Sequence, residues 1–199
     1  MEPLSRSAAL LVIDVQKAID DPVWGRRNNM RADENIAALL AAWRASGRPI
    51  YHIKHNSTAP DSPYRPGQDG NDFKPCAAPR PGEAVIEKTV NSAFIGTDLE
   101  DRLRAAGHDL LVIVGVLTNN SVEATARMAG NLGFATHVVS DATAAADLTD
   151  LDGRTWLAQE VHALSLANLA GDYASIVDTG AVLEACDPPD PLPVAVGAV

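Results

Sequence analysis

The 199-residue chain is poor in cysteine, in basic residues and in long apolar runs. Its two cysteines, Cys76 and Cys186, lie in proline-containing segments, a context that indicates neither a disulfide framework nor a thiolate metal site. The chain has 16 Lys and Arg against 26 Asp and Glu, which gives a net charge of −10. Because phosphate binding needs clustered basic side chains, this balance argues against nucleic acid as a partner and favours simple solubility.

The N-terminal residues carry Glu2, Pro3 and two serines before one short apolar run, a pattern that fits neither a secretory signal nor a membrane span. We therefore expect a cytoplasmic protein that does not bind membranes. With 46% hydrophobic residues, the chain is long enough to form one domain around one core. We assign that domain to residues 1–186 and expect residues 187–199, which include four prolines, to form a floppy tail.

Short apolar runs alternate with segments of helical pattern along the chain, which predicts an α/β fold with helices on both faces of a parallel sheet. The expected strands are residues 9–15, 49–53, 84–86, 110–114, 134–140 and 173–177. The expected helices are residues 31–45, 98–106, 122–131 and 155–170. Residues 57–82 are rich in Pro, Gly and Asp and show no helix or strand pattern, so their length suggests a lid or binding loop.

Two charged residues stand at the ends of predicted strands. Asp14 closes a strand that is otherwise aliphatic, where its carboxylate could serve as a general base, or could equally cap the following turn. Lys88 follows the third strand, where an ammonium could stabilise a carboxylate or a developing oxyanion. Lysines at strand ends are common on protein surfaces, so Lys88 alone indicates little.

The segment from Gly115 to Arg127 leaves an apolar strand through a polar turn and starts a helix. Helix N-termini at the carboxyl edge of a parallel sheet offer unpaired N–H groups to an anion, so we predict an active-site elbow with Ser121 as its hydroxyl. Asn120 and Glu123 also match a capping box, which makes Ser121 the first helical residue. The two interpretations are compatible.

Three segments, residues 11–16 (LVIDVQ), 87–94 (EKTVNSAF) and 115–127 (GVLTNNSVEATAR), resemble the isochorismatase-like, or cysteine hydrolase, superfamily. The likeness covers nearly the whole chain to about Leu183. The resemblance implies a three-layer α/β/α sandwich around a six-stranded parallel sheet, without a cofactor, assembled as a homo-oligomer, either a dimer or a tetramer.

The resemblance also implies that Asp14 and Lys88 belong to a catalytic triad whose third member is residue 121. It further implies a cis peptide bond between Val116 and Leu117, which directs backbone N–H groups of the elbow into the site. The family's third member is normally Cys, and this chain has Ser121 instead. A serine hydroxyl is not ionised near neutral pH and needs a competent base beside it.

Lys88 is expected to be a poor base, because an opposite charge on Asp14 would make it hold its proton more tightly. The leading hypothesis is a hydrolase that acts on a small molecule, and amides and related C–N bonds are the first expected substrates. Asp14 is then the general acid/base, Lys88 its electrostatic partner, and Ser121 a weak nucleophile or a group that positions water. Two alternatives remain: vinyl-ether cleavage by Asp14 without a nucleophile, and a pseudoenzyme that binds a metabolite without turnover.

Metal-dependent relatives such as nicotinamidases carry an Asp-x-His pair after the second strand, and this chain has His52 and His55 there instead. Their three-residue offset sends the two imidazoles to opposite faces of the strand, so we expect no bound metal. His55, at the start of the long loop, is better placed to meet substrate. The other expected substrate contacts are Trp24, Arg26, Tyr64, Leu117 and Asn120.

Overall fold

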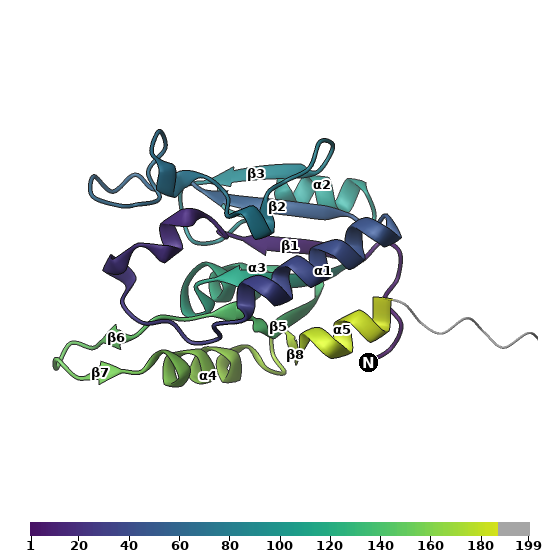
Figure 1. The fold of residues 1–199 in the computed structure, drawn as a ribbon. Coiled ribbons are helices and arrows are strands. Elements are labelled where there is room, and N and C mark those ends of the chain that lie inside the picture. The colour runs from purple at the N-terminus through teal and green to yellow at the C-terminus, as the bar shows by residue number, and fades with distance from the viewer. Residues whose placement is uncertain (187–199) are drawn as a thin grey trace, which may run out of the picture.

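A parallel sheet forms the centre of the computed structural model, which describes residues 1–186 (Figure 1). Its six strands stand in the order β3-β2-β1-β4-β5-β8. They are β1 (Ala9–Ile13), β2 (Ile50–His55), β3 (Ala84–Lys88), β4 (Leu110–Val116), β5 (Ala135–Ala144) and β8 (Ser175–Val177). The chain runs outward from β1 to one edge and then resumes at β4 on the other side of β1. Ligands of such sheets bind at this switch point, beyond the carboxyl ends of β1 and β4.

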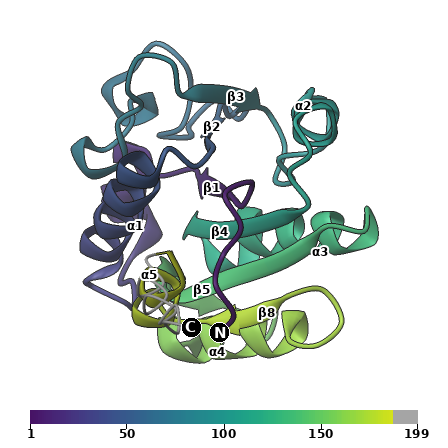
Figure 2. The same ribbon diagram turned by 90° about the vertical axis from the view of Figure 1, so that its right-hand side faces the viewer.

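Helices cover both faces of the sheet, which confirms the predicted three-layer sandwich. Helices α1 (Ala32–Ser46) and α5 (Thr179–Cys186) lie on one face, and α2 (Leu99–Ala105) and α3 (Glu123–Asn131) on the other (Figure 2). Helix α4 (Ala158–Leu169) contributes its buried Leu169 to the same core cluster as α2 and α3.

Strand β1 shows why both faces must be covered. Its side chains alternate between the two core clusters, with Leu11 and Ile13 in one and Leu10 and Val12 in the other, and all four are fully buried. A strand that is apolar on both faces fits the centre of a parallel sheet, because each face is then packed against helices.

Residues 155–170 do not form the single helix that their pattern predicts. Strand β6 (Leu148–Thr149) pairs with β7 (Thr155–Trp156) in a short antiparallel hairpin, and α4 begins only at Ala158. The carboxylate of Asp150 folds the hairpin turn, since it accepts hydrogen bonds from the backbone N–H groups of Asp152 and Arg154 and from the Trp156 indole. These side-chain contacts compete with helix formation.

Other differences concern short elements. Helix α5 was not predicted, because its eight residues are too few for a helical period to stand out. The long loop contains two 3₁₀ turns, η3 (Asp69–Asn71) and η4 (Pro75–Ala77), where no element was expected. The prediction of a tail at residues 187–199 falls outside the described residues. Every helix within residues 1–186 is too short or too polar to cross a membrane.

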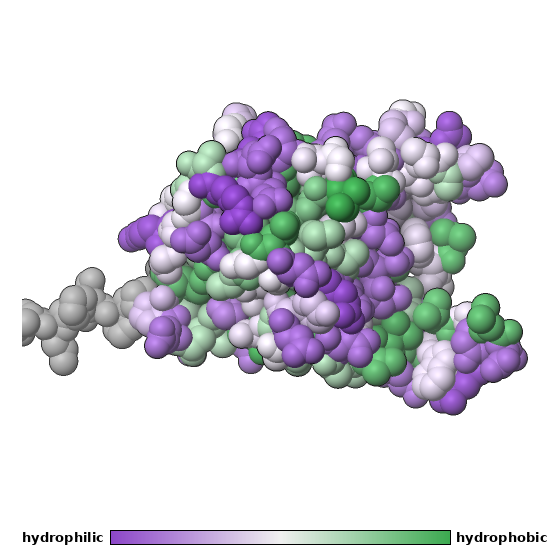
Figure 3. All heavy atoms as spheres, turned by 180° about the vertical axis from the view of Figure 1, so that it is seen from behind, coloured by the Kyte–Doolittle hydropathy of each residue, from purple (hydrophilic) through white to green (hydrophobic). Residues whose placement is uncertain are grey.

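Apolar side chains are exposed around the hairpin and α4. Seen from behind, they gather at the lower right of the molecule (Figure 3). Leu151 at the hairpin tip is fully exposed, and Leu148 and Leu164 are about half exposed or more. Such a patch suits contact with another protein surface. The homo-oligomer stays a prediction.

Glu83 connects three parts of the fold. Its carboxylate accepts hydrogen bonds from the Arg44 guanidinium of α1 at 2.7 and 2.9 Å, from the backbone N–H of Arg80 at 2.8 Å, and lies 2.8 Å from Nε2 of His52 in β2. The hydrogen bonds from Arg44 are the main reason that the pKa of Glu83 falls from its ordinary value of 4.5 to about 2.

Because the folded-state pKa of Glu83 is lowered, its contribution to stability is present above pH 4.5 and is lost as pH falls toward 2. We expect Glu83→Gln to remove on the order of 3 kcal/mol at neutral pH and to flatten the acid limb of the stability profile in that interval. Urea unfolding at several pH values measures this. Glu87→Gln, on the exposed side of β3, is the control for the loss of one negative charge and should cost far less unfolding free energy at neutral pH.

Candidate functional site

Three side chains that are distant in the sequence meet at the carboxyl edge of the sheet. Asp14 follows β1, Lys88 ends β3, and Ser121 lies in η5 (Thr118–Val122), the turn after β4. The Lys88 ammonium donates to Oδ2 of Asp14 at 2.7 Å and to Oγ of Ser121 at 3.2 Å. All three residues are at most 5% exposed. We call these three residues the triad.

Asp14 is held by its backbone, which leaves its carboxylate free for the cavity. Its φ of 54° is in the left-handed region, and its carbonyl accepts hydrogen bonds from the N–H of Gln16 at 2.8 Å and the hydroxyl of Tyr64 at 3.3 Å. Oδ2 accepts from Lys88, and Oδ1 has no hydrogen-bond partner within residues 1–186. The carboxylate therefore does not cap the following turn, so this alternative is wrong.

Burial controls the ionisation of the two charged members of the triad. It raises the pKa of the Asp14 carboxyl, although the neighbouring Lys88 ammonium opposes this shift. Burial likewise lowers the pKa of Lys88, because loss of water outweighs the attraction of Asp14. The prediction that Lys88 holds its proton more tightly is therefore wrong. Asp14 gains basicity from its site, which is what a general base requires.

The elbow after β4 is not a simple helix cap. The peptide bond between Val116 and Leu117 is cis, and Asn120 departs from helical geometry with φ −123° and ψ −105°. The predicted capping box is wrong, since the Glu123 carboxylate instead accepts hydrogen bonds from Ser165 and from Arg127. Ser121 consequently sits inside the turn and faces Lys88.

Helix α4 supports the elbow from behind. Oγ1 of Thr118 lies 2.8 Å from Nδ1 of His162, and Oγ of Ser165, whose hydrogen bonds to Glu123, lies 3.1 Å from the Thr118 carbonyl oxygen. Both α4 side chains are buried. The sequence did not indicate that either residue contacts the elbow, because nothing local to α4 shows which turn it packs against.

A small cavity of about 70 Å³ opens beside the triad. It is lined by Asp14, Ile19, Trp24, His55, Tyr64, Asn91, Val116, Leu117, Asn120 and Ser121. This volume is well above the roughly 10–15 Å³ that a cavity needs to hold one water molecule. It therefore suits a small reacting group, whose remaining atoms would extend toward solvent.

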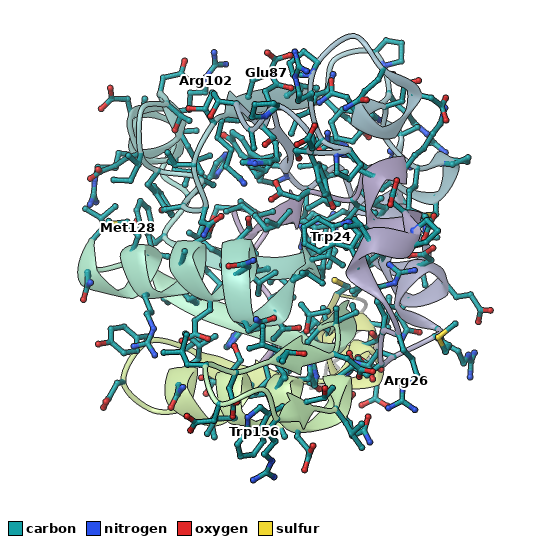
Figure 4. The ribbon with its side chains drawn as sticks, turned by 90° about the vertical axis from the view of Figure 1, so that its left-hand side faces the viewer. Trp24, Arg26, Glu87, Arg102, Met128 and Trp156 are labelled. Atoms are coloured by element: carbon teal, nitrogen blue, oxygen red, sulfur yellow. The ribbon has the colours of Figure 1, made fainter. Side chains whose placement is uncertain are left out.

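Five of the predicted substrate contacts line this cavity, and one does not. Trp24 lies near the centre of the face in Figure 4, whereas Arg26 lies toward its margin. The Arg26 side chain is 60% exposed, and its Nε lies 3.5 Å from Asp147. Arg26 is therefore not a cavity residue, contrary to the prediction. Asn91 was missed, although it belongs to the EKTVNSAF segment, and its amide donates to Oδ1 of Asn120 at 3.4 Å.

Residues 8–180 match the family profile described as the Isochorismatase domain, which covers most of the chain and includes every member of the triad. The chain belongs to the isochorismatase family of hydrolases.

The sequences and structures of relatives align with most of this isochorismatase-family chain. The Bacillus subtilis isochorismatase family protein YrdC is 43% identical over 176 residues, which cover 88% of this chain and 94% of YrdC. A Chromobacterium violaceum crystal structure, described as a hydrolase of the isochorismatase family, is 54% identical with a TM-score of 0.89, covering 94% of this chain and 98% of that one. Nicotinamidase 3 of Arabidopsis thaliana is 29% identical over 190 residues, covering 89% of this chain and 87% of the relative.

The two histidines of β2 lie on opposite faces in this isochorismatase-family chain, as their spacing predicts. His52 contacts Glu83 and the Phe73 ring, whereas His55 lines the cavity beside the triad. Among residues 1–186, no three His, Cys, Asp or Glu side chains are grouped so that they could hold a metal ion.

Proposed function

We propose that this isochorismatase-family hydrolase cleaves an amide or related C–N bond of a small molecule. In this proposal Ser121 is the nucleophile, Asp14 the general acid/base and Lys88 the electrostatic partner. The observation that carries it is the contact of one buried ammonium with both a carboxylate and a hydroxyl in the wall of a small cavity. The name of the relative nicotinamidase 3 supports an amide as the substrate class.

The proposed reaction uses the free oxygen of the carboxylate. Oδ1 of Asp14 takes the hydroxyl proton of Ser121 while Oγ attacks the carbonyl carbon, and the Lys88 ammonium stabilises the negative charge that develops. The C–N bond then breaks, and Asp14 passes its proton to the leaving nitrogen. Water attacks the resulting ester with Asp14 again accepting a proton, and this proton returns to Oγ as the acid leaves.

A second candidate is vinyl-ether cleavage without a nucleophile. The raised pKa of Asp14 favours it, because a carboxyl that holds a proton can act as a general acid. Asp14 would protonate the double bond, water would add to the adjacent carbon, and Ser121 would only orient that water. The hemiketal formed would then release the alcohol.

The deciding experiment measures turnover of small amides and enol ethers by the native chain and by Ser121→Ala, Ser121→Cys and Asp14→Asn. We expect Ser121→Ala to lower amide hydrolysis by about 10²-fold or more and Ser121→Cys to retain or raise it, because a thiol is the stronger nucleophile. An acyl group trapped on residue 121, detected by mass spectrometry, would support the proposal.

Other outcomes overturn it. Activity that survives Ser121→Ala but not Asp14→Asn, on an enol ether, would favour the second candidate. Ligand binding without turnover in every variant would identify a metabolite-binding pseudoenzyme instead.

A further inference from the structure

His55 lies directly beside Lys88 across two neighbouring strands. The two residues are register partners in the parallel pairing of β2 with β3, so their side chains share one face of the sheet. Nζ of Lys88 lies 3.4 Å from Nδ1 of His55. His55 thus reaches the same ammonium that contacts Asp14 and Ser121.

The hydrogen-bond inventory of this ammonium fixes the tautomer of His55. An ammonium has three hydrogens and no lone pair, so it can only donate. Its three neighbours within hydrogen-bond distance are Oδ2 of Asp14, Oγ of Ser121 and Nδ1 of His55. Nδ1 must therefore present a lone pair, and a neutral imidazole then carries its hydrogen on Nε2.

Two buried amides hold the backbone of His55 in place. Oε1 of Gln16 accepts from the N–H of His55 at 2.7 Å, and Nε2 of Gln16 donates to its carbonyl at 3.0 Å. The Asn71 amide donates to the same carbonyl at 3.1 Å. Gln16 and Asn71 are both almost completely buried. The backbone that carries the imidazole is therefore held in a fixed position at the cavity wall.

The surroundings keep the ring neutral and oriented. The Tyr64 ring packs edge-on against it with centroids 5.7 Å apart, and Trp24 packs against Tyr64 in turn. Burial, with a further contribution from Lys88, lowers the pKa of His55 to about 4. Nε2 has no hydrogen-bond partner within the described residues, while the ring lines the cavity.

We propose that His55 is a specificity-determining residue that presents Nε2–H to the cavity as a fixed neutral donor. It selects substrates that carry an acceptor oxygen, such as a carbonyl or carboxylate, beside the reacting bond. Groups that only donate, such as an amidinium, gain no hydrogen bond from Nε2–H, although they can still pair with Oδ1 of Asp14. The location of the reacting bond rests on the proposed function, but the donor role of His55 does not.

The tautomer is tested without any substrate. Nitrogen-15 NMR of the full chain reports which ring nitrogen carries the hydrogen, and His55→Gln identifies the signal among the five histidines. We expect His55 to be protonated on Nε2 alone at pH 7 and to stay neutral down to pH 5. In Lys88→Met, which removes the ammonium, the two tautomers should mix and the pKa should rise. A hydrogen on Nδ1 in the native chain would overturn the proposal.

The donor role is tested with two small probes of similar shape, acetate and acetamidinium, titrated by NMR. His55→Gln keeps an N–H donor and should bind acetate within about threefold of the native chain, whereas His55→Phe should bind it roughly 10-fold more weakly or worse. Acetamidinium can pair with Oδ1 of Asp14 but not with Nε2–H, so its affinity should differ by no more than about threefold among the three. Equal acetate binding by His55→Phe and the native chain would overturn the proposal. Because neither probe is turned over, this result is independent of whether the proposed hydrolysis is correct.

Discussion

Asp14→Asn should lower kcat by about 10²–10⁴-fold on whichever substrate the native chain hydrolyses, with the fold retained. The amide has nearly the shape of the carboxylate and can still accept a hydrogen bond from Lys88 through its oxygen. It cannot take a proton from Ser121 or from water, so both candidate reactions lose their acid/base. Steady-state kinetics, with circular dichroism as the check on folding, measures the effect.

Asp21→Asn is the matched control for this variant. Asp21 lies in the loop that follows Asp14, where its side chain accepts a hydrogen bond from the N–H of Val23 and does not line the cavity. Asn caps such turns as well as Asp does, so the variant changes the net charge equally without disturbing the triad. Its kcat should stay within about twofold of the native value. Full activity in Asp14→Asn would exclude both candidate reactions.

The family resemblance predicts the triad, and the positions of its members at strand ends agree with their meeting at one site. Asp14 and Lys88 each stand at the end of a strand, and Ser121 lies in the turn that follows another strand. Because the strands are parallel, these positions lie at the same edge of the sheet. His55 was expected near the cavity because it ends β2, and Tyr64, which was expected to contact substrate without such an argument, also lines the cavity.

The wrong predictions concern features that are set by contacts between segments distant in the sequence. The direction of the Lys88 pKa shift follows from burial by the surrounding elements, and a pair of opposite charges read from the sequence alone suggests the reverse. Glu123 looks like the acid of a capping box, but α4 brings Ser165 to it, 42 residues away. Arg26 lies only two residues from Trp24, yet the chain turns at Gly25, and its side chain reaches Asp147 instead.

Gly115→Ala should cost about 4 kcal/mol or more of unfolding free energy, which is a large fraction of the roughly 5–15 kcal/mol by which native domains are stable. Gly115 has φ +121°, a conformation that L side chains rarely adopt. A Cβ at this position would lie 2.1 Å from the carbonyl oxygen of Ile13 and 2.7 Å from its nitrogen. Both are backbone atoms in the pairing of β1 with β4, so neither can move away cheaply.

Gly107→Ala separates this steric cost from the general cost of alanine at a positive φ. Gly107 has φ +68°, and a Cβ there would meet no atom within 4 Å, so we expect a loss of only about 1–2 kcal/mol by urea unfolding. Equal losses of unfolding free energy in the two variants would show that the close approach of β4 to β1 adds nothing to the cost of Gly115→Ala. Ile13 directly precedes Asp14, and Gly115 directly precedes the cis bond of the elbow. The narrow contact at Gly115 therefore sets the separation of the two chain segments that carry the carboxylate and the hydroxyl.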